Sequence, residues 1–304
     1  MQADFDELKN FNFLACDVFL WVFKKSTTVN KFNAQYVRTD PDLEVSFKSM
    51  ANIEIIRLVE FSPYSYLAEN HENGCLSAPI LGSDFEFLKR QVDRPEPEHS
   101  VTGVKDLEGA EGYVVKFFHN GRTVYAVKKS STTWKTAYPK KFINMVFRNG
   151  ELSTAEDKSF SIEKNFDFYC VNETAFVAQK RAFESVMQYK TGFAQAFVQL
   201  RQNAQFSGLF TDLQPLIVYV GTNSIQLRRM ATIEKKNIYS AQTFLPNLQQ
   251  VNIRHGWGLN FDPVSNKIVP CPQTAKMILE VLLDHRLMSE VTNHVYIVPD
   301  AVLA

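Results

Sequence analysis

The 304-residue sequence has few cysteines and no long hydrophobic run. Its most apolar stretch, residues 11–23, is interrupted by Asn12 and Asp17, whereas a membrane-spanning helix needs roughly 18 or more apolar residues in succession. The first residues carry neither the basic start nor the apolar stretch of a signal peptide. We therefore expect a cytoplasmic chain that does not insert directly into a membrane.

The cysteines and histidines form no metal-binding pattern. The four cysteines, at positions 16, 75, 170 and 271, include no Cys-x-x-Cys pair and have no nearby histidine, and the six histidines show no paired ligand spacing. The sequence also lacks a P-loop, a dinucleotide-binding glycine pattern and a nucleophile elbow. It predicts no metal and no cofactor, and gives no support for an enzyme.

Acidic residues are absent from one long stretch, residues 112–150. The whole chain balances 33 basic against 33 acidic residues, and residues 1–100 hold ten basic and sixteen acidic ones. The acid-free stretch holds eight cations: Lys116, Arg122, Lys128, Lys129, Lys135, Lys140, Lys141 and Arg148. Tyr125, Trp134 and Tyr138 are interleaved with them. This pattern fits either a polyanion site or a solvated positive face of hairpins.

A second group of cations lies on a predicted helix near residue 230, where Glu234 partly offsets it. These cations either bind nucleic acid or flank an amphipathic helix whose Leu227, Met230 and Ile233 point inward. From the two groups we predict these DNA-binding residues: Lys128, Lys129, Lys135, Lys140, Lys141, Arg122, Arg228, Arg229, Lys235 and Lys236. We expect the side chains of Lys128, Lys129, Lys140 and Lys141 to face solvent.

The first hundred residues predict a small α+β unit, residues 1–95. Residues 11–23 are apolar at odd and even positions, which indicates a strand covered on both faces. Residues 44–47 and 53–61 favour further strands, and residues 83–92 a helix capped by Ser83. The proline-bracketed, acidic residues 93–98 predict a domain boundary.

Residues 100–178 predict a β-rich basic unit made of hairpins. Asn-Gly or polar turns separate β-forming runs near residues 119–121, 149–150 and 172–174. Residues 180–205 then show helical periodicity, and residues 216–220 favour a buried strand. These belong to a third unit, residues 179–304, so the predicted fold class is α+β with small mixed or antiparallel sheets.

The last ninety residues predict a helix from Asn223 to Lys236, a turn at Asn237, and a second helix that starts at Pro246. Two short β-runs follow, at residues 258–261 and 267–269. This order is compatible with a winged-helix-like module. Residues 273–287 predict an amphipathic helix, and residues 294–298 a closing strand.

Two alternatives to a DNA-binding protein remain open. Glu234 and Lys236 satisfy a bare Glu-x-Lys spacing, with Asp212 upstream, as in some metal-dependent nucleases. In such sites the pair lies on a strand, whereas this segment predicts a helix. Alternatively, the acidic first unit could dock on a basic partner surface, as a protein-protein adaptor does without binding nucleic acid.

Three segments carry a family resemblance. Residues 166–187, residues 229–239 followed by 244–245, and residues 284–296 resemble the KwaB family of the bacterial Kiwa anti-phage system, through hydrophobic patterns in the C-terminal half. The resemblance implies a non-enzymatic, largely sequence-independent DNA-binding effector that opposes phage DNA replication or transcription. It also implies recruitment to the inner membrane by a small multi-pass protein, KwaA. We further expect a homodimer. No residue-level DNA motif transfers, so the predicted contacts rest on charge.

Overall fold

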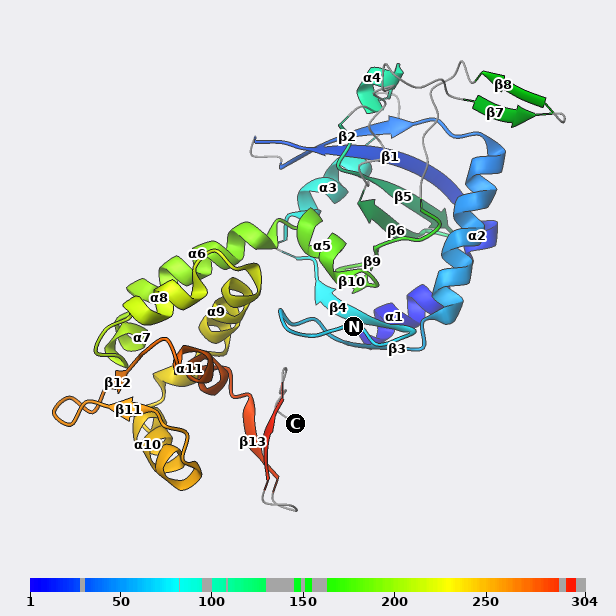
Figure 1. Cartoon of the computed structure of the whole chain (residues 1–304). Coiled ribbons are helices and arrows are strands. Elements are labelled where there is room, and N and C mark those ends of the chain that lie inside the picture. The colour runs from blue at the N-terminus through cyan, green and yellow to red at the C-terminus, as the bar shows by residue number, and fades with distance from the viewer. Residues whose placement is uncertain are drawn as a thin grey trace. The chain divides into compact units, whose positions relative to one another are not determined.

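The computed structural model describes residues 1–27, 31–81, 83–94, 100–107, 109–129, 145–148, 151–154, 163–289 and 294–298. The chain forms two compact units (Figure 1). Unit 1 comprises Met1–Tyr64 and Glu69–Met187, and unit 2 comprises Ser65–Ala68 and Gln188–Ala304. Within the ranges described, no helix is both long and apolar enough to cross a membrane. The mixture of helices and sheets confirms the predicted α+β class.

Unit 1 is built on an eight-stranded sheet with the order β2-β1-β5-β6-β9-β10-β4-β3. Neighbouring strands are antiparallel except β3 and β4, which are parallel. The strands are β1 Asp17–Lys25, β2 Phe32–Val37, β3 Glu60–Pro63, β4 Gly74–Pro79, β5 Gly112–His119, β6 Arg122–Lys129, β9 Phe168–Val171 and β10 Thr174–Val177. A separate hairpin pairs β7 Met145–Arg148 with β8 Glu151–Thr154.

The sheet extends across the boundary predicted at residues 93–98. Strand β1 pairs with β5, and β4 pairs with β10, so strands from before and after these residues alternate in one sheet. The predicted N-terminal and middle units therefore share a single sheet. The division between the two compact units falls instead at Met187 and Gln188, beyond β10.

The local turn signals confirm the predicted hairpins. Strands β5 and β6 meet at Asn120 and Gly121, which both have positive φ, 48° and 76°. Strands β9 and β10 meet at Asn172, with φ 50°. Asparagine and glycine tolerate this left-handed conformation, which gives the twist that a two-residue hairpin loop needs. Asn149 and Gly150, between β7 and β8, lie outside the described residues.

Three segments predicted as strands lie wholly or partly in helices. Residues 44–47 and 53–57 belong to one helix, α2 Pro41–Arg57, and residues 216–220 belong to α8 Gln214–Val220. The Asp40 side chain accepts a hydrogen bond from the Leu43 amide, and Pro41 opens α2, which are strong start signals for a helix. A short apolar run alone does not distinguish a strand from a buried helix.

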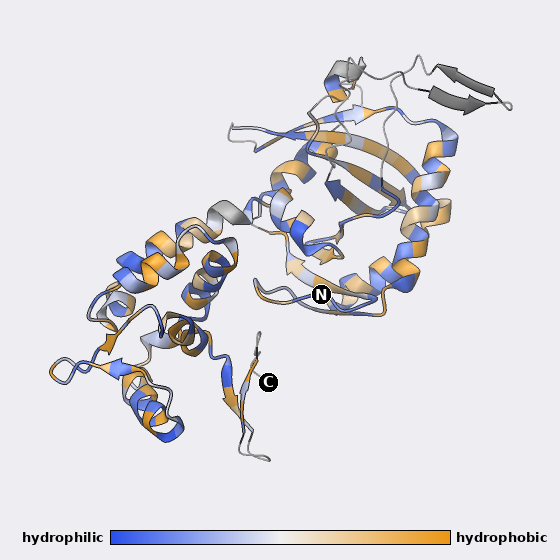
Figure 2. Cartoon of the chain, viewed as in Figure 1, coloured by the Kyte–Doolittle hydropathy of each residue, from blue (hydrophilic) through white to orange (hydrophobic). Residues whose placement is uncertain are grey.

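Helices cover the sheet on both faces. Helices α1 Gln2–Lys9 and α2 pack with the short 3-10 helix η1 Phe13–Ala15 on one face, against Leu20 and Val22 of β1. Trp21 and Phe23 alternate to the other face, and hydrophobic residues run along the strands (Figure 2). That face is covered by α3 Phe85–Val92 and α5 Lys180–Val186, through ring contacts of Phe168. The short α4 Val104–Leu107 precedes β5.

This arrangement confirms a doubly covered strand within residues 11–23, although β1 starts at Asp17. It also confirms the predicted helix at residues 83–92. Ser83 does not cap that helix, however, because its hydroxyl donates to the Ile80 carbonyl oxygen.

Unit 2 is mainly helical. Its elements are α6 Tyr189–Gln202, α7 Ala204–Gly208, α8, α9 Ser224–Lys236, η4 Ile238–Ser240, α10 Phe244–His255, β11 Asn260–Phe261, β12 Ile268–Val269, α11 Ala275–Leu282, β13 Arg286–Met288 and β14 Val295–Ile297. The helix predicted over residues 180–205 is interrupted at Gln188, which has φ 55°. The closing strand is confirmed as β14, whereas the helix predicted over residues 273–287 ends at Leu282.

The helix, turn, helix and hairpin of the last ninety residues are present in the predicted order. The Asn223 side chain accepts hydrogen bonds from the amides of Ile225 and Gln226 and so caps α9, and Asn237 ends it with φ 49°. Helix α10 starts at Phe244, two residues before the predicted Pro246. Helix α9 packs chiefly against α6. A winged-helix arrangement stays a prediction.

One short segment of the N-terminal half of the chain belongs to unit 2. Tyr66 and Leu67 pack against the hydrophobic core of that unit, and the Tyr66 ring lies 4.8 Å from the ring of Phe193 on α6. The ammonium of Lys235 lies 5.6 Å from the centre of the same ring. Ser65–Ala68 is therefore part of the helical unit although both flanking segments belong to the sheet unit.

Candidate nucleic-acid interface

The predicted DNA-binding cations fall into three places. Arg122, Lys128 and Lys129 lie on β6, and Arg228, Arg229, Lys235 and Lys236 lie on α9. Lys135, Lys140 and Lys141 lie outside the described residues, as do Trp134 and Tyr138.

Lys128 does not face solvent, so this expectation is wrong. Its side chain is 7% exposed, and its ammonium lies 3.1 Å from Asp167 Oδ1 and 2.6 Å from Glu163 Oε2. It also donates a hydrogen bond to Asn165 Oδ1 at 2.9 Å. An ammonium has three donors, and all three are used here. Lys128 is buried because β6 is an interior strand, and it is not available to a phosphate.

Lys129 ends β6 and is half-buried. Its backbone amide donates to Asp167 Oδ2, while its ammonium has no ion-pair partner in the part of the chain that the structure describes. Burial raises the pKa of Asp167, against the hydrogen bond from Lys129 and the charge of Lys128. Lys129 thus remains a candidate phosphate contact beside the segment that starts at residue 130.

The acid-free stretch is compensated by carboxylates from elsewhere in the sequence. Asp93 lies 3.0 Å from the ammonium of Lys116, and Asp167 and Glu163 neutralise Lys128. Although burial opposes it, hydrogen bonds from Lys89, Tyr125 and Lys116 lower the pKa of Asp93 and keep it ionised. The local charge of residues 112–129 is therefore well below what the sequence count suggests.

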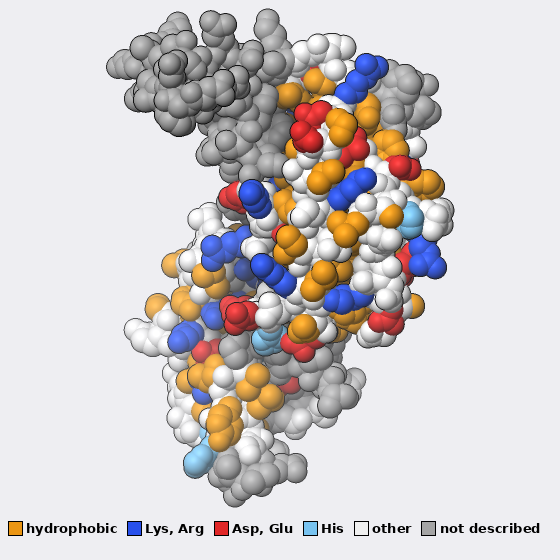
Figure 3. Space-filling view, turned by 90° about the vertical axis from the view of Figure 1, so that its right-hand side faces the viewer, with side chains coloured by type: hydrophobic (Ala, Val, Ile, Leu, Met, Phe, Trp, Pro, Cys, Tyr) orange, Lys and Arg blue, Asp and Glu red, His pale blue; other side chains and the backbone are white. Residues whose placement is uncertain are grey.

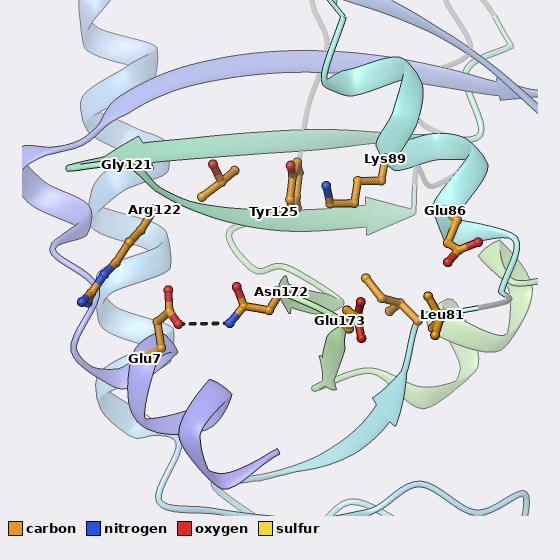
Figure 4. A pocket seen from close by; sticks show the side chains of 11 residues that line it. Glu7, Leu81, Glu86, Lys89, Gly121, Arg122, Tyr125, Asn172 and Glu173 are labelled. Carbon is orange, nitrogen blue, oxygen red and sulfur yellow. Dashed lines mark hydrogen bonds between the residues drawn. The ribbon is translucent and has the colours of Figure 1, made fainter.

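Arg122 is exposed and lines a cavity of about 650 Å³ beside the β5–β6 turn (Figure 4). The carboxylates of Glu7, Glu86 and Glu173 line the same cavity, with Lys89 as its other cation. Three carboxylates against two cations give the cavity a negative balance. It is therefore a poor site for a phosphate group.

The aromatic residue predicted beside these cations does not offer a free ring. Tyr125 is 4% exposed, and its hydroxyl donates to Asp93 Oδ1 at 2.6 Å. Burial and this hydrogen bond raise the pKa of Tyr125. The ammonium of Lys89 lies 5.2 Å from the centre of the ring. Tyr125 supports the fold of the sheet and cannot stack on a nucleic-acid base.

Helix α9 brings four of the predicted cations together. The Arg228 guanidinium lies 5.6 Å from the centre of the Phe193 ring, and Lys236 donates to the Leu283 carbonyl oxygen at 3.0 Å. Arg229 donates to Gln226, and Lys235 is exposed above Tyr66. Neither Arg229 nor Lys235 forms an ion pair with any of the carboxylates that the structure describes.

The opposite side of α9 is apolar, as predicted. Leu227, Met230 and Ile233 are buried in the core of unit 2. Both interpretations of this helix given by the sequence are thus compatible with its geometry, because the inward face is apolar and Arg229 and Lys235 form no ion pair with a described carboxylate.

The excess of positive charge lies in unit 2. Residues 188–289 contain ten basic and five acidic residues, a balance of +5. On the face of the molecule shown in Figure 3, basic and acidic side chains are interspersed with hydrophobic ones. A charge count limited to residues 112–150 therefore overestimates the net charge around β6. It also misses the positive balance of residues 188–289, where basic residues outnumber acidic ones two to one.

The residues of the nuclease hypothesis lie on or beside helices. Glu234 and Lys236 are on α9, as predicted, and Glu234 is exposed. Asp212 precedes α8, where its carboxylate accepts a hydrogen bond from the Gln214 amide at 2.9 Å. Among the residues with described positions, no group of three or more histidine, cysteine or acidic side chains could hold a metal ion.

Comparison with known proteins identifies a family for this chain. A family model described as Kiwa protein KwaB-like matches residues 107–292, which extend from β5 to β13 and include every predicted DNA-binding residue. No curated protein and no solved structure matches the chain.

Proposed function

The chain belongs to the KwaB-like family and is thus a component of a Kiwa anti-phage defence system, and from this premise we propose that it is a non-enzymatic effector that binds DNA largely independently of sequence. By occupying phage DNA it blocks replication or transcription. An integral membrane partner resembling KwaA recruits it to the inner membrane, and the effector acts as a homodimer.

The observation that carries the proposal of DNA binding is the charge of unit 2. Its described residues include ten basic and five acidic ones, and α9 holds four of the ten basic residues together with one acid, Glu234. Lysine and arginine contacts to phosphates provide affinity without sequence information, because every nucleotide presents the same phosphate. A surface of this kind therefore favours binding to many DNA sequences.

Salt dependence tests this proposal. Each phosphate contact releases condensed counterions, so affinity for labelled duplex DNA should fall by orders of magnitude between ~50 and ~200 mM salt if several cations engage. The measurement is fluorescence anisotropy at a series of salt concentrations, with single-stranded DNA and RNA in parallel. Supercoiled plasmid incubated with the protein and magnesium should stay intact. An affinity that does not change with salt, or no binding at low salt, would contradict the proposal, and nicking of the plasmid would favour a nuclease.

A further inference from the structure

The outward face of α10 is polar and exposed. Its exposed positions follow the spacing of one helix face: Thr243, Pro246, Asn247, Gln250, Ile253 and Arg254. Ile253 is 81% exposed, whereas Leu248 on the inward side is 5% exposed. In Figure 1 this helix lies at one end of unit 2. The face is therefore accessible along the whole length of the helix.

Four amide side chains on α10 divide into two pairs with different roles. Asn252 exchanges two hydrogen bonds with the backbone of Leu259, both 2.9 Å long, and Gln249 donates to the Asn266 carbonyl oxygen at 3.3 Å. This inner pair holds the β11–β12 hairpin against the helix. The outer pair, Asn247 and Gln250, makes no side-chain hydrogen bond with any described residue. The outer amides are therefore free to bind a ligand.

The charge of α10 suits a polyanion. The helix contains no Asp or Glu, and Arg254 and His255 lie in its last turn. The Arg254 guanidinium has no partner among the residues that the structure describes. Since α10 has no carboxylate of its own and residues 188–289 have a positive balance, the helix attracts a phosphate backbone, although Asp284 and Arg286 line a pocket beside Asn247.

The chemistry of the face matches the edges of DNA bases. Asparagine and glutamine amides pair with adenine in the major groove, arginine pairs with guanine, and an apolar side chain contacts the thymine methyl group. Helix α10 follows α9 and the 3-10 helix η4 and precedes the β11–β12 hairpin, and the major groove of B-DNA is wide enough to admit an α-helix. A single strand has no such groove.

We propose that α10 enters the major groove of duplex DNA and that Asn247, Gln250 and Arg254 contact the edges of base pairs. This inference rests on the proposed function and identifies its ligand as duplex DNA. Phosphate contacts made elsewhere in unit 2 supply most of the affinity, and the contacts of α10 add a smaller part that depends on the base sequence.

The test compares two double variants of the full chain. Asn247→Ala with Gln250→Ala removes the outer amides, while Gln202→Ala with Gln205→Ala removes two exposed amides from α6 and α7 as a matched control. The α10 variant should bind duplex DNA roughly tenfold or more weakly, with an unchanged salt slope, because base contacts release no counterions. The control variant should bind as the natural chain does. All four positions are exposed, and circular dichroism with thermal unfolding verifies the fold.

Competition with groove-binding dyes gives an independent measurement. Methyl green, which occupies the major groove, should displace the protein from duplex DNA, whereas netropsin, which occupies the minor groove, should not. A further variant, Gln250→Glu, should weaken binding more than Gln250→Ala because its carboxylate repels phosphate.

The possible results are distinct. Duplex binding that is equal in the natural chain and the α10 variant overturns this inference and leaves the proposed function in place. Displacement by netropsin but not by methyl green would also overturn this inference and leave the proposed function in place. Absence of DNA binding by the natural chain at low salt overturns the proposed function itself, and this inference with it.

Discussion

The side chains of Lys128 and Asp167 are 7% and 4% exposed, so their ion pair lies in surroundings of low dielectric constant. The pair joins the end of β6 to the start of β9, and Glu163 and Asn165 complete the coordination of the ammonium. Loss of one partner of such a pair leaves the other charge buried without compensation. This lysine therefore contributes to the stability of the sheet.

We predict that Lys128→Ala lowers the free energy of unfolding by about 3–5 kcal/mol, the usual cost of an uncompensated buried charge. Lys129→Ala is the matched control. It keeps the backbone amide that donates to Asp167 and should change stability by about 0.5 kcal/mol or less. Urea denaturation measures both. Equal changes in the free energy of unfolding for the two substitutions would show that the buried ion pair does not stabilise the folded protein.

Glu54 of α2 is a second, half-buried charge in unit 1. Its carboxylate accepts hydrogen bonds from the Phe166 amide and the Tyr169 hydroxyl. Burial raises the pKa of Glu54 despite these hydrogen bonds. The folded protein therefore binds this proton more tightly than the unfolded chain does, and stability falls as pH rises through the window between the two pKa values.

The pH dependence of Glu54→Gln checks this direction. We expect the free energy of unfolding of the natural chain, minus that of the variant, to decrease as pH rises above 4.5, the ordinary pKa of the carboxyl. The slope can reach about 1.4 kcal/mol per pH unit inside the window and is zero above it. Chemical denaturation from pH 4 to pH 8 gives the curve. A difference that increases with pH would mean that the hydrogen bonds outweigh burial.

At the scale of elements, α9 is the predicted source of phosphate contacts. Replacing Arg229 and Lys235 with Glu should weaken DNA binding and reduce the log–log salt slope by about 0.9 for each lost contact. The matched control replaces Arg122 and Arg181 of unit 1, both exposed, with the same change of net charge. Salt titrations of DNA binding by the two variants show whether α9 or the exposed surface of unit 1 contacts the phosphates. A control that binds as weakly as the α9 variant would show that total charge matters rather than the position of this helix.

The elements that the sequence predicts correctly are those with local signals. The β5–β6 and β9–β10 hairpins follow from asparagine and glycine at turns, and α9 follows from the Asn223 cap. Helices α2 and α8 were predicted as strands because short apolar runs fit both structures, and tertiary packing decides between them.

The pairing of strands and the pairing of charges could not be predicted, because both depend on residues distant in sequence. Strand β4 joins β10 across the segment predicted as a boundary, and Asp93 reaches Lys116 from that same segment. A count of charges along the chain cannot include such partners. It therefore overestimated the accessibility of Lys128. For α9, whose cations contact the rings of Phe193 and Tyr66 and a backbone carbonyl oxygen, DNA binding stays a prediction.

At the scale of the whole molecule, membrane association is predicted to come from a partner. Expressed alone, the chain should fractionate with soluble proteins, and co-expressed with a neighbouring multi-pass membrane protein it should move to the membrane fraction. Basic residues can bind anionic lipids at ~1 kcal/mol per well-placed cation, so the fractionation includes a high-salt wash. Sedimentation with membranes in the absence of a partner, if it persists in high salt, would contradict the prediction.

The position of Ser65–Ala68 in unit 2 has a consequence for dissecting the protein into modules. The backbone passes between the two units after Tyr64, after Ala68 and after Met187, so one cut does not separate them. A fragment that starts at Gln188 lacks Tyr66, whose ring contacts Phe193 and lies beneath Lys235. Proteolytic nicking after Met187 would leave this ring covalently attached to the sheet and still docked among the helices. Each unit is therefore compact in space, but neither consists of one continuous stretch of the sequence.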